Sequence, residues 1–221
     1  MVAEELINHM IPPLKLTDDA HKAIVWMEEF RCNQLPVTQN TTYLGMISED
    51  MILEGNDIEK KIGEFELIAT QIYIGKNTHF FDILKVATEN KLQSIAVVDA
   101  EKNYQGVITV QDTMTAFAQS SAIQMPGGIL VLSMDQRDYS LSRISSLIEE
   151  NDAKILNTIV KEDENDPNKI KLTLKINTFE LNRIVATLER FEYKIIARFQ
   201  ETDVTNTERE KIDMLLRYLE I

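Results

Sequence analysis

The chain has 221 residues, of which 44% are hydrophobic, so it can build real cores in one to three domains and is not disordered throughout. It holds 23 Lys and Arg against 36 Asp and Glu, a net charge of −13. That acidity argues against nucleic acid and anionic membrane surfaces as partners. The single cysteine, Cys32, excludes an internal disulfide, and the N-terminus lacks a signal-peptide pattern, so we expect a cytoplasmic protein.

Two successive stretches of about 60 residues follow one pattern. Each has a short extended segment, an amphipathic helix, an apolar strand, a turn and a second strand that leads into another helix. Gly45 and Gly106 occupy the same place in the two second strands, 61 residues apart. Asp18 or Asp19 is placed to cap the first helix, and the matching helix of the second repeat follows Thr78. One unit is too small to bury its own apolar face, so we expect the two to pack together.

After the expected linker at 121–127 the pattern of predicted helices and strands changes. We expect strands at 129–134, 155–160, 170–176 and 194–199, an acidic turn at 162–168, and helices marked by Leu141–Ile148 and Leu181–Phe191, the second opened by a capping pair of Asn177 and Glu180. The order βαββαβ is the split βαβ or ferredoxin-like arrangement. One more helix with an apolar stripe is predicted from Thr207. The fold class is α/β, in the broad sense that includes α+β.

Recognisable catalytic motifs are missing from the sequence. The three histidines are scattered, no metal-ligand spacing occurs, and Cys32 has no His or Asn partner nearby in sequence, so a structural thiol is favoured over a nucleophile. An enzyme acting through Cys32 or a hidden pair of carboxylates is the less favoured alternative.

The most specific segment runs from Gly106 to Asp112. It places the Thr109 hydroxyl and the Asp112 carboxylate three residues apart, with Gln111 between them, where a strand becomes a helix. A carboxylate can hold the hydroxyls of a ribose, but Thr109 as helix cap and Asp112 in the first helical turn are also favourable without a ligand. From these residues alone, a ligand site and a helix cap without a ligand are equally favoured interpretations.

The duplicated unit resembles a tandem cystathionine-β-synthase-type (CBS) repeat pair, or Bateman module. The resemblance covers residues 1–120 and rests on Leu35-Pro36-Val37 with Tyr43–Ser48, and on Ser94–Asp99 with Gly106–Asp112. It implies a regulatory ligand that contains adenosine, such as AMP or S-adenosylmethionine, and no obligatory cofactor. It implies that Asp112, with Thr109 beside it, binds the ribose hydroxyls. It further implies that the segment near Met10 and Pro12 covers the base, and that the cleft is lined by Cys32, Asn33, Gln34 and Ser94.

The first repeat departs from this pattern because Met51 stands where the ribose carboxylate should be, and Asp50 lies one residue early. We therefore expect one competent site on Asp112 and one degenerate site. No Arg or Lys falls at the cleft positions that can be aligned, and residues 1–120 hold nine basic and 18 acidic residues. Phosphate is thus expected to contribute little, which favours adenosine, AMP or S-adenosylmethionine over ATP.

The second half resembles an ACT domain in its pattern of elements, and the whole chain resembles acetoin-utilisation B-type proteins. No glycine follows Gly128, so amino-acid binding at the loop 133–140 is expected to be lost. The expected domains are CBS repeats at 1–60 and 61–120, a linker at 121–127, an ACT-like domain at 128–201 and a C-terminal helix at 202–221. The expected function is a non-catalytic, homodimeric sensor that acts on an unidentified regulated protein. The alternative is a dimeric interaction module that binds no ligand.

Overall fold

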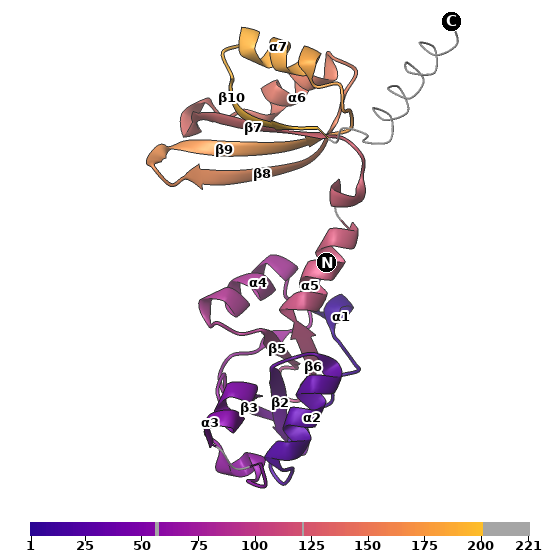
Figure 1. Cartoon of the computed structure of the whole chain (residues 1–221), viewed down its shortest axis with the longest axis vertical. Coiled ribbons are helices and arrows are strands. Elements are labelled where there is room, and N and C mark those ends of the chain that lie inside the picture. The colour runs from indigo at the N-terminus through magenta and orange to yellow at the C-terminus, as the bar shows by residue number, and fades with distance from the viewer. Residues whose placement is uncertain (56–57, 121, 201–221) are drawn as a thin grey trace, which may run out of the picture. The chain divides into compact units, whose positions relative to one another are not determined.

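A computed structural model describes residues 1–55, 58–120 and 122–200 of the chain (Figure 1). The chain divides into two compact units, Met1–Gln119 and Ser120–Ile221, which we describe separately. The helix that we expect from Thr207 lies outside the described residues.

The first unit contains two copies of one βαββα motif. After the short helix α1 (Ala3–Leu6), the first copy consists of β1 (Leu14–Lys15), α2 (Ala20–Phe30), β2 (Gln34–Gln39), β3 (Thr42–Ser48) and α3 (Glu49–Gly55). A 3₁₀ turn, η1 (Ile62–Glu64), leads to the second copy, which consists of β4 (Ile74–Gly75), α4 (Phe80–Glu89), β5 (Ser94–Val98), β6 (Tyr104–Thr109) and α5 (Val110–Ser120). Each copy forms a three-stranded sheet, in the orders β1-β2-β3 and β4-β5-β6. The duplicated unit predicted from the sequence is therefore confirmed.

The strand registers of the two copies match residue for residue. Val37 pairs with Gly45 in the first sheet, and Val97 pairs with Gly106 in the second. Gln34 lies opposite Ser48 as Ser94 lies opposite Thr109. This register makes Met51 the structural counterpart of Asp112.

The two copies are joined by reciprocal contacts. The amide of Tyr43 donates to the carbonyl of Lys102 at 3.2 Å, and the amide of Tyr104 donates to the carbonyl of Thr41 at 2.7 Å. The Gln34 side-chain oxygen accepts the amides of Gln93 at 2.9 Å and Ser94 at 3.3 Å. A Gln34 side chain from one copy thus fixes the start of a strand in the other.

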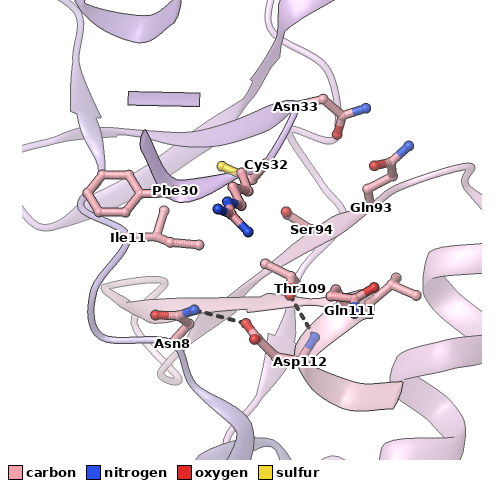
Figure 2. A pocket seen from close by; sticks show the side chains of 12 residues that line it. Asn8, Ile11, Phe30, Cys32, Asn33, Gln93, Ser94, Thr109, Gln111 and Asp112 are labelled. Carbon is pink, nitrogen blue, oxygen red and sulfur yellow. Dashed lines mark hydrogen bonds between the residues drawn. The ribbon is translucent and has the colours of Figure 1, made fainter. Parts of the chain in front are cut away.

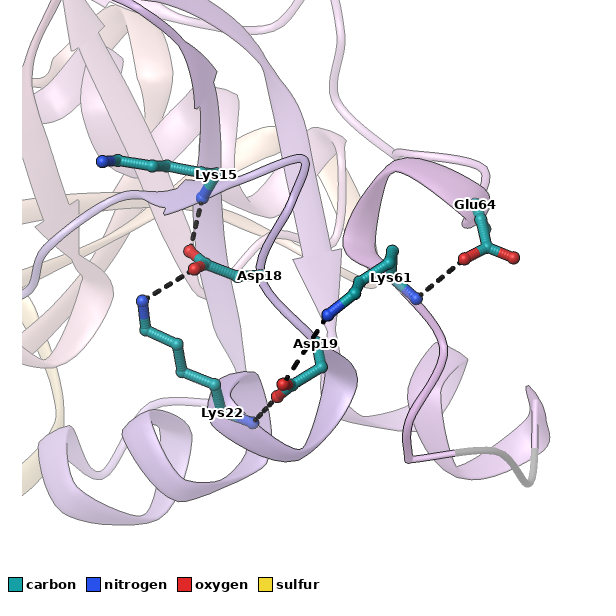
Figure 3. Close-up of polar contacts among 6 residues, drawn as sticks. All are labelled: Lys15, Asp18, Asp19, Lys22, Lys61 and Glu64. Atoms are coloured by element: carbon teal, nitrogen blue, oxygen red, sulfur yellow. Dashed lines mark hydrogen bonds and ion pairs between the residues drawn. The ribbon is translucent and has the colours of Figure 1, made fainter.

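The N-terminus of α2 is held by two adjacent carboxylates (Figure 3). Asp19 is the N-cap, and its side chain accepts the amide of Lys22 at 2.8 Å. Asp18 accepts the amide of Lys15 and the ammonium of Lys22, both at 2.8 Å. Of the two caps that the sequence allows, Asp19 is the one used. In the second copy His79 takes the same place and accepts the amide of Phe81 at 3.4 Å.

The second unit is a four-stranded antiparallel sheet with helices over one face (Figure 1). Its elements are β7 (Gly128–Asp135), α6 (Leu141–Glu149), β8 (Ile155–Asp163), β9 (Asp166–Ile176), α7 (Asn182–Arg190) and β10 (Lys194–Phe199). The order β10-β7-β9-β8 and the βαββαβ succession confirm the ferredoxin-like arrangement. Its core consists of alternate β7 and β9 residues packed on α6 and α7, among them Leu130, Leu132, Leu172, Ile144 and Ile184.

Two local expectations for this unit are wrong. The acidic segment 162–168 is not all turn, because β8 continues to Asp163 and β9 begins at Asp166, with Pro167 inside the strand. Asn177 and Glu180 do not cap α7: its N-cap is Leu181, without a side-chain hydrogen bond. The Asn177 side chain instead accepts the amide of Lys154 at 2.7 Å, and this hydrogen bond tethers the start of β8.

Candidate functional site

A cavity of about 380 Å³ lies between the two repeats of the first unit (Figure 2). Its size falls in the range of small-molecule sites. Three segments surround it: the N-terminal segment, the end of α2 with the turn into β2, and the second-repeat turns that enter β5 and α5. The lining residues are Asn8, Ile11, Phe30, Arg31, Cys32, Asn33, Gln93, Ser94, Thr109, Val110, Gln111 and Asp112.

Asp112 sits in the first turn of α5 and is oriented from two sides. Its amide donates to the Thr109 hydroxyl at 2.9 Å, which makes Thr109 the local cap of the helix. Its carboxylate Oδ2 accepts the side-chain amide of Asn8 at 2.9 Å. Figure 2 shows both hydrogen bonds on the cavity wall. The carboxylate is thus held in place through Oδ2, while no donor from residues 1–55, 58–120 or 122–200 bonds to Oδ1.

The corresponding turn of the first repeat keeps the cap and lacks the carboxylate. The amide of Met51 donates to the Ser48 hydroxyl at 3.4 Å, as the amide of Asp112 donates to Thr109. Met51 offers a thioether where Asp112 offers a carboxylate oxygen. The turn therefore forms in both repeats, but only the second equips it to accept hydroxyl protons.

Two buried polar atoms on the cavity wall have no hydrogen-bond partner among the residues that the structure describes. They are the hydroxyl of Ser94, a residue that is only 1% exposed, and the side-chain oxygen of Asn33. An unpaired buried polar group costs about 1–3 kcal/mol, so such atoms call for a partner. A ligand in this cavity could supply one to each.

The structure brings most of the sequence-predicted residues together. Thr109, Gln111, Asp112, Ser94, Asn33 and Cys32 all line the cavity. Gln34 is not on the wall, because its side chain is buried and bonded to the amides of Gln93 and Ser94. Met10 and Pro12 are not on it either. Met10 is 76% exposed, and Ile11 between them, which is 4% exposed, lines the cavity instead.

Arg31 corrects the expectation that no basic residue borders the cleft. It follows the last residue of α2 and adopts the left-handed conformation with φ 53°, and it lines the cavity together with Cys32. The direction of the Arg31 side chain depends on its positive φ, which the sequence pattern does not predict for a residue other than glycine. Asn8 was missed for a similar reason, because it reaches the site through a β-bridge with Val107.

The Cys32 thiol borders the cavity but is not activated. Burial raises its pKa, and the hydrogen bond from the Gln34 amide lowers it by less. A raised pKa reduces the thiolate fraction at neutral pH, and the thiolate is the nucleophilic form. The environment of Cys32 therefore suits packing.

The family comparison matches the second repeat. A model described as "CBS domain" matches residues 64–119, which begin at the last residue of η1 and end one residue before the end of α5. The chain contains a CBS domain. That range includes Ser94, Thr109 and Asp112, whereas Asn8, Arg31 and Asn33 come from residues before it.

Solved structures of CBS domain pairs are similar to this chain. A CBS domain pair/ACT domain protein from Thermotoga maritima is 15% identical, with a TM-score of 0.47 over 54% of this chain and 98% of that chain. CBSX2 in complex with AMP is 18% identical, with a TM-score of 0.47 over 53% and 96%. The CBS domain pair of MJ0100, in complex with 5′-methylthioadenosine and S-adenosylmethionine, is 16% identical, with a TM-score of 0.47 over 55% and 98%.

Within residues 1–55, 58–120 and 122–200, no helix is both long and apolar enough to cross a membrane.

Proposed function

We propose that this protein is a non-catalytic regulatory sensor that binds one adenosine-containing ligand in the cavity between its CBS repeats. The observation that carries the proposal is the carboxylate of Asp112, which the Asn8 side chain holds at the wall of a cavity of about 380 Å³, on a helical turn that Thr109 caps. A fixed carboxylate with an available oxygen suits the vicinal hydroxyls of ribose. The apolar side chains of Ile11 and Phe30 on the same cavity suit a base.

The test is isothermal titration calorimetry of the full chain against adenosine, AMP, ADP, ATP and S-adenosylmethionine. We expect at least one of them to bind with a stoichiometry of one per chain. Asp112→Asn should weaken that ligand about 10- to 100-fold, because hydrogen bonds to charged groups contribute about 1.5–3 kcal/mol. The matched control is Asp50→Asn, which removes the same charge from the first-repeat helix and should change affinity less than twofold.

Two results would contradict the proposal. Flat heats with the whole panel would favour the alternative, a dimeric interaction module without a ligand. Equal losses from Asp112→Asn and Asp50→Asn would show that the ribose is not held at the Asp112 turn.

We further propose that the second unit is an ACT-like signalling module and that the chain works as a homodimer of the acetoin-utilisation B type. The ferredoxin-like order of the second unit supports this reading, as does its exposed edge strand β8, where Ile159 and Val160 are 58% and 48% exposed. Light scattering after size-exclusion chromatography should give twice the mass of one chain, and a monomer at every concentration would contradict it.

An enzymatic role through Cys32 is the weaker alternative. The raised pKa of this thiol predicts slow reaction with iodoacetamide at pH 7.5, slower than that of free cysteine. Alkylation faster than free cysteine would reopen the enzymatic reading.

A further inference from the structure

We infer that the sheet of the second unit, on the face opposite α6 and α7, is the docking surface for the chain's own C-terminal segment, residues 207–219. This segment lies outside the described residues, and its sequence complements the sheet face in apolar character, in charge and in length. The proposed adenosine site belongs to the first unit, so the failure of either proposal would leave the other untouched.

The open face, as we call it, is the side of the sheet away from α6 and α7 (Figure 1). The buried core residues alternate along β7 and β9, and the residues between them point to the open face, because successive side chains of a strand point to opposite sides. Strand register then defines three rows across the open face. These rows are Phe199-Ile129-Lys175-Asn157, Ala197-Val131-Thr173-Ile159 and Lys194-Ser133-Lys171-Lys161.

Apolar side chains gather in the first two of these rows. Ile159 and Phe199 lie on the two edge strands and are 58% and 59% exposed. Ile129 and Val131 are only partly buried, although they belong to a central strand. A contiguous apolar surface of this kind commonly marks an interaction site.

Lysines border this apolar surface and make the open face basic. Its three rows hold four lysines and, all within the described residues, no carboxylate. Two carboxylates of the neighbouring turn pair with it: Asp163 lies 3.1 Å from Lys171, and Glu164 lies 2.6 Å from Lys161. An excess of positive charge remains. Two copies packed face to face would set lysines against lysines, which opposes binding, so a partner that brings carboxylates suits this face better than a second copy.

The C-terminal segment has the matching character. Residues 201–221 hold six acidic and three basic residues, a net charge of −3. Ile212, Leu215, Leu216 and Leu219 recur at the spacing of one helix face, which predicts an apolar stripe. A helix of this length is marginal alone in water, so the stripe requires a surface to cover it.

The chain is long enough to bring this segment to the open face. Phe199 ends β10 and belongs to the open face itself. Residues 201–206, if extended, span about 20 Å, whereas the four strands measure about 14 Å from edge to edge. A helix over 207–219 would be about 20 Å long, close to the length of a six-residue strand such as β10. Such docking leaves the backbone edge of β8 free for the proposed dimer.

The experiment measures how fast a maleimide alkylates a single cysteine in the full-length chain. Cys32→Ser removes the natural thiol, and Leu216→Cys or Arg217→Cys then supplies the reporter. Arg217 is the matched control because it lies about 100° further round the predicted helix, off the apolar stripe. We expect Leu216→Cys to react about tenfold more slowly than Arg217→Cys, because docking covers the stripe.

Substitutions in the sheet unit then test whether the open face gives this protection. Thr173→Asp and, separately, Ile159→Asp place a carboxylate in the central row and should each abolish the protection of Leu216→Cys. The matched control Ser142→Asp adds the same charge at an exposed position of α6 and should preserve it. Circular dichroism checks that each variant is folded.

A mixing experiment separates the chain's own face from that of a second copy. Chains with the Leu216→Cys reporter are unfolded and refolded with an excess of cysteine-free chains that carry Thr173→Asp. Protection that persists supports the inference, whereas protection that declines as the excess rises would assign the segment to a second copy and overturn it.

Three further results would also overturn the inference. Equal alkylation of Leu216→Cys and Arg217→Cys would show that the stripe is open to solvent. Protection that survives both open-face substitutions would mean that another surface covers the segment. Loss of protection in Ser142→Asp as well would reveal a general effect of added charge.

Discussion

At the scale of single residues, the site is marked by polar atoms that the fold leaves unpaired. The Ser94 hydroxyl is buried and has no partner in the described part of the chain, whereas the equally buried Thr113 hydroxyl, one turn into α5, donates to the carbonyl of Thr109 at 3.0 Å. A buried hydroxyl that contributes nothing to the fold is a cost in the free protein. Ligand binding would recover that cost.

The pair Ser94→Ala and Thr113→Val tests this contrast. Ser94→Ala should leave the free energy of unfolding unchanged or raise it by up to about 1 kcal/mol, while AMP affinity falls about three- to tenfold. Thr113→Val, which removes a satisfied hydroxyl, should lower the free energy of unfolding by about 1 kcal/mol. Urea titration and calorimetry measure the two quantities, and a clear loss of stability in Ser94→Ala would mean that its hydroxyl has a partner in the free protein.

The local part of the site is visible in the sequence, and the assembled part is not. Thr109 and Asp112 are three residues apart at a strand-to-helix junction, so their joint position follows from local geometry. Asn8 and Arg31 arrive through chain packing and a left-handed backbone turn. Such contacts depend on tertiary structure, which periodicity does not record. The sequence places the segment of Met10 and Ile11 at the cleft but does not determine which of these side chains faces inward, which depends on tertiary packing.

At the scale of elements, helix termini in this chain use different devices for the same task. The first helix of repeat one begins with a pair of aspartates, that of repeat two with His79, and α7 with no side-chain cap at all. Residue types alone therefore predict the cap of α2 correctly. They predict the wrong cap for α7, because the Asn177 side chain accepts the amide of Lys154 instead. Apolar spacing was the better guide, because packing of the helix face determines where a helix forms.

Asp18 gives the start of α2 a dependence on acid. Burial raises the pKa of its carboxyl, but the hydrogen bonds from the Lys22 side chain and the Lys15 amide, and the charges of both lysines, lower it further, so the pKa lies below the ordinary value of 3.8. A pKa lowered in the folded state stabilises the protein above the unfolded value, and this stabilisation is lost as the pH falls through the folded value. The loss thus occurs below pH 3.8.

Asp18→Asn should lower the free energy of unfolding at pH 7 by about 1 kcal/mol and flatten its decline below pH 4. The readout is the fluorescence of Trp26, the only tryptophan of the chain, which lies in α2. The control, Asp82→Asn, removes an exposed carboxylate from the first turn of α4. An acid profile of Asp18→Asn that parallels the wild type would show that Asp18 does not carry this dependence.

At the scale of the whole molecule, the chain builds its units around separate cores. The clusters of the first unit involve residues from Ala3 to Val107 and Ile108, and the cluster of the second runs from Leu130 to Leu188. Both architectures were predictable, because the repeat of about 60 residues and the alternation of 170–176 reflect topology directly. Units with separate cores can unfold in separate steps.

Gly127→Ala tests that independence. Gly127 has φ +146°, and a Cβ there would lie 1.9 Å from the carbonyl oxygen of Ile176, so the substitution should destabilise the second unit by about 2 kcal/mol or more. Circular dichroism should show an earlier transition, while the Trp26 fluorescence transition stays in place. Gly75→Ala, where a Cβ meets nothing within 4 Å, should leave both transitions nearly unchanged. A shift of the Trp26 transition with Gly127→Ala would mean that the units unfold together.

The side chain of Gln34 has an evolutionary consequence. In a freshly duplicated chain the two repeats would be interchangeable, and either could provide the pocket. Here Gln34 is the first-repeat counterpart of Ser94, and its side-chain oxygen accepts the amides of Gln93 and Ser94. The first repeat therefore supports the start of a strand in the second, and the second provides the unpaired hydroxyl on the cavity wall. A chain assembled from two copies of either repeat would lose one of these roles, so the descendants of the duplication can no longer exchange places.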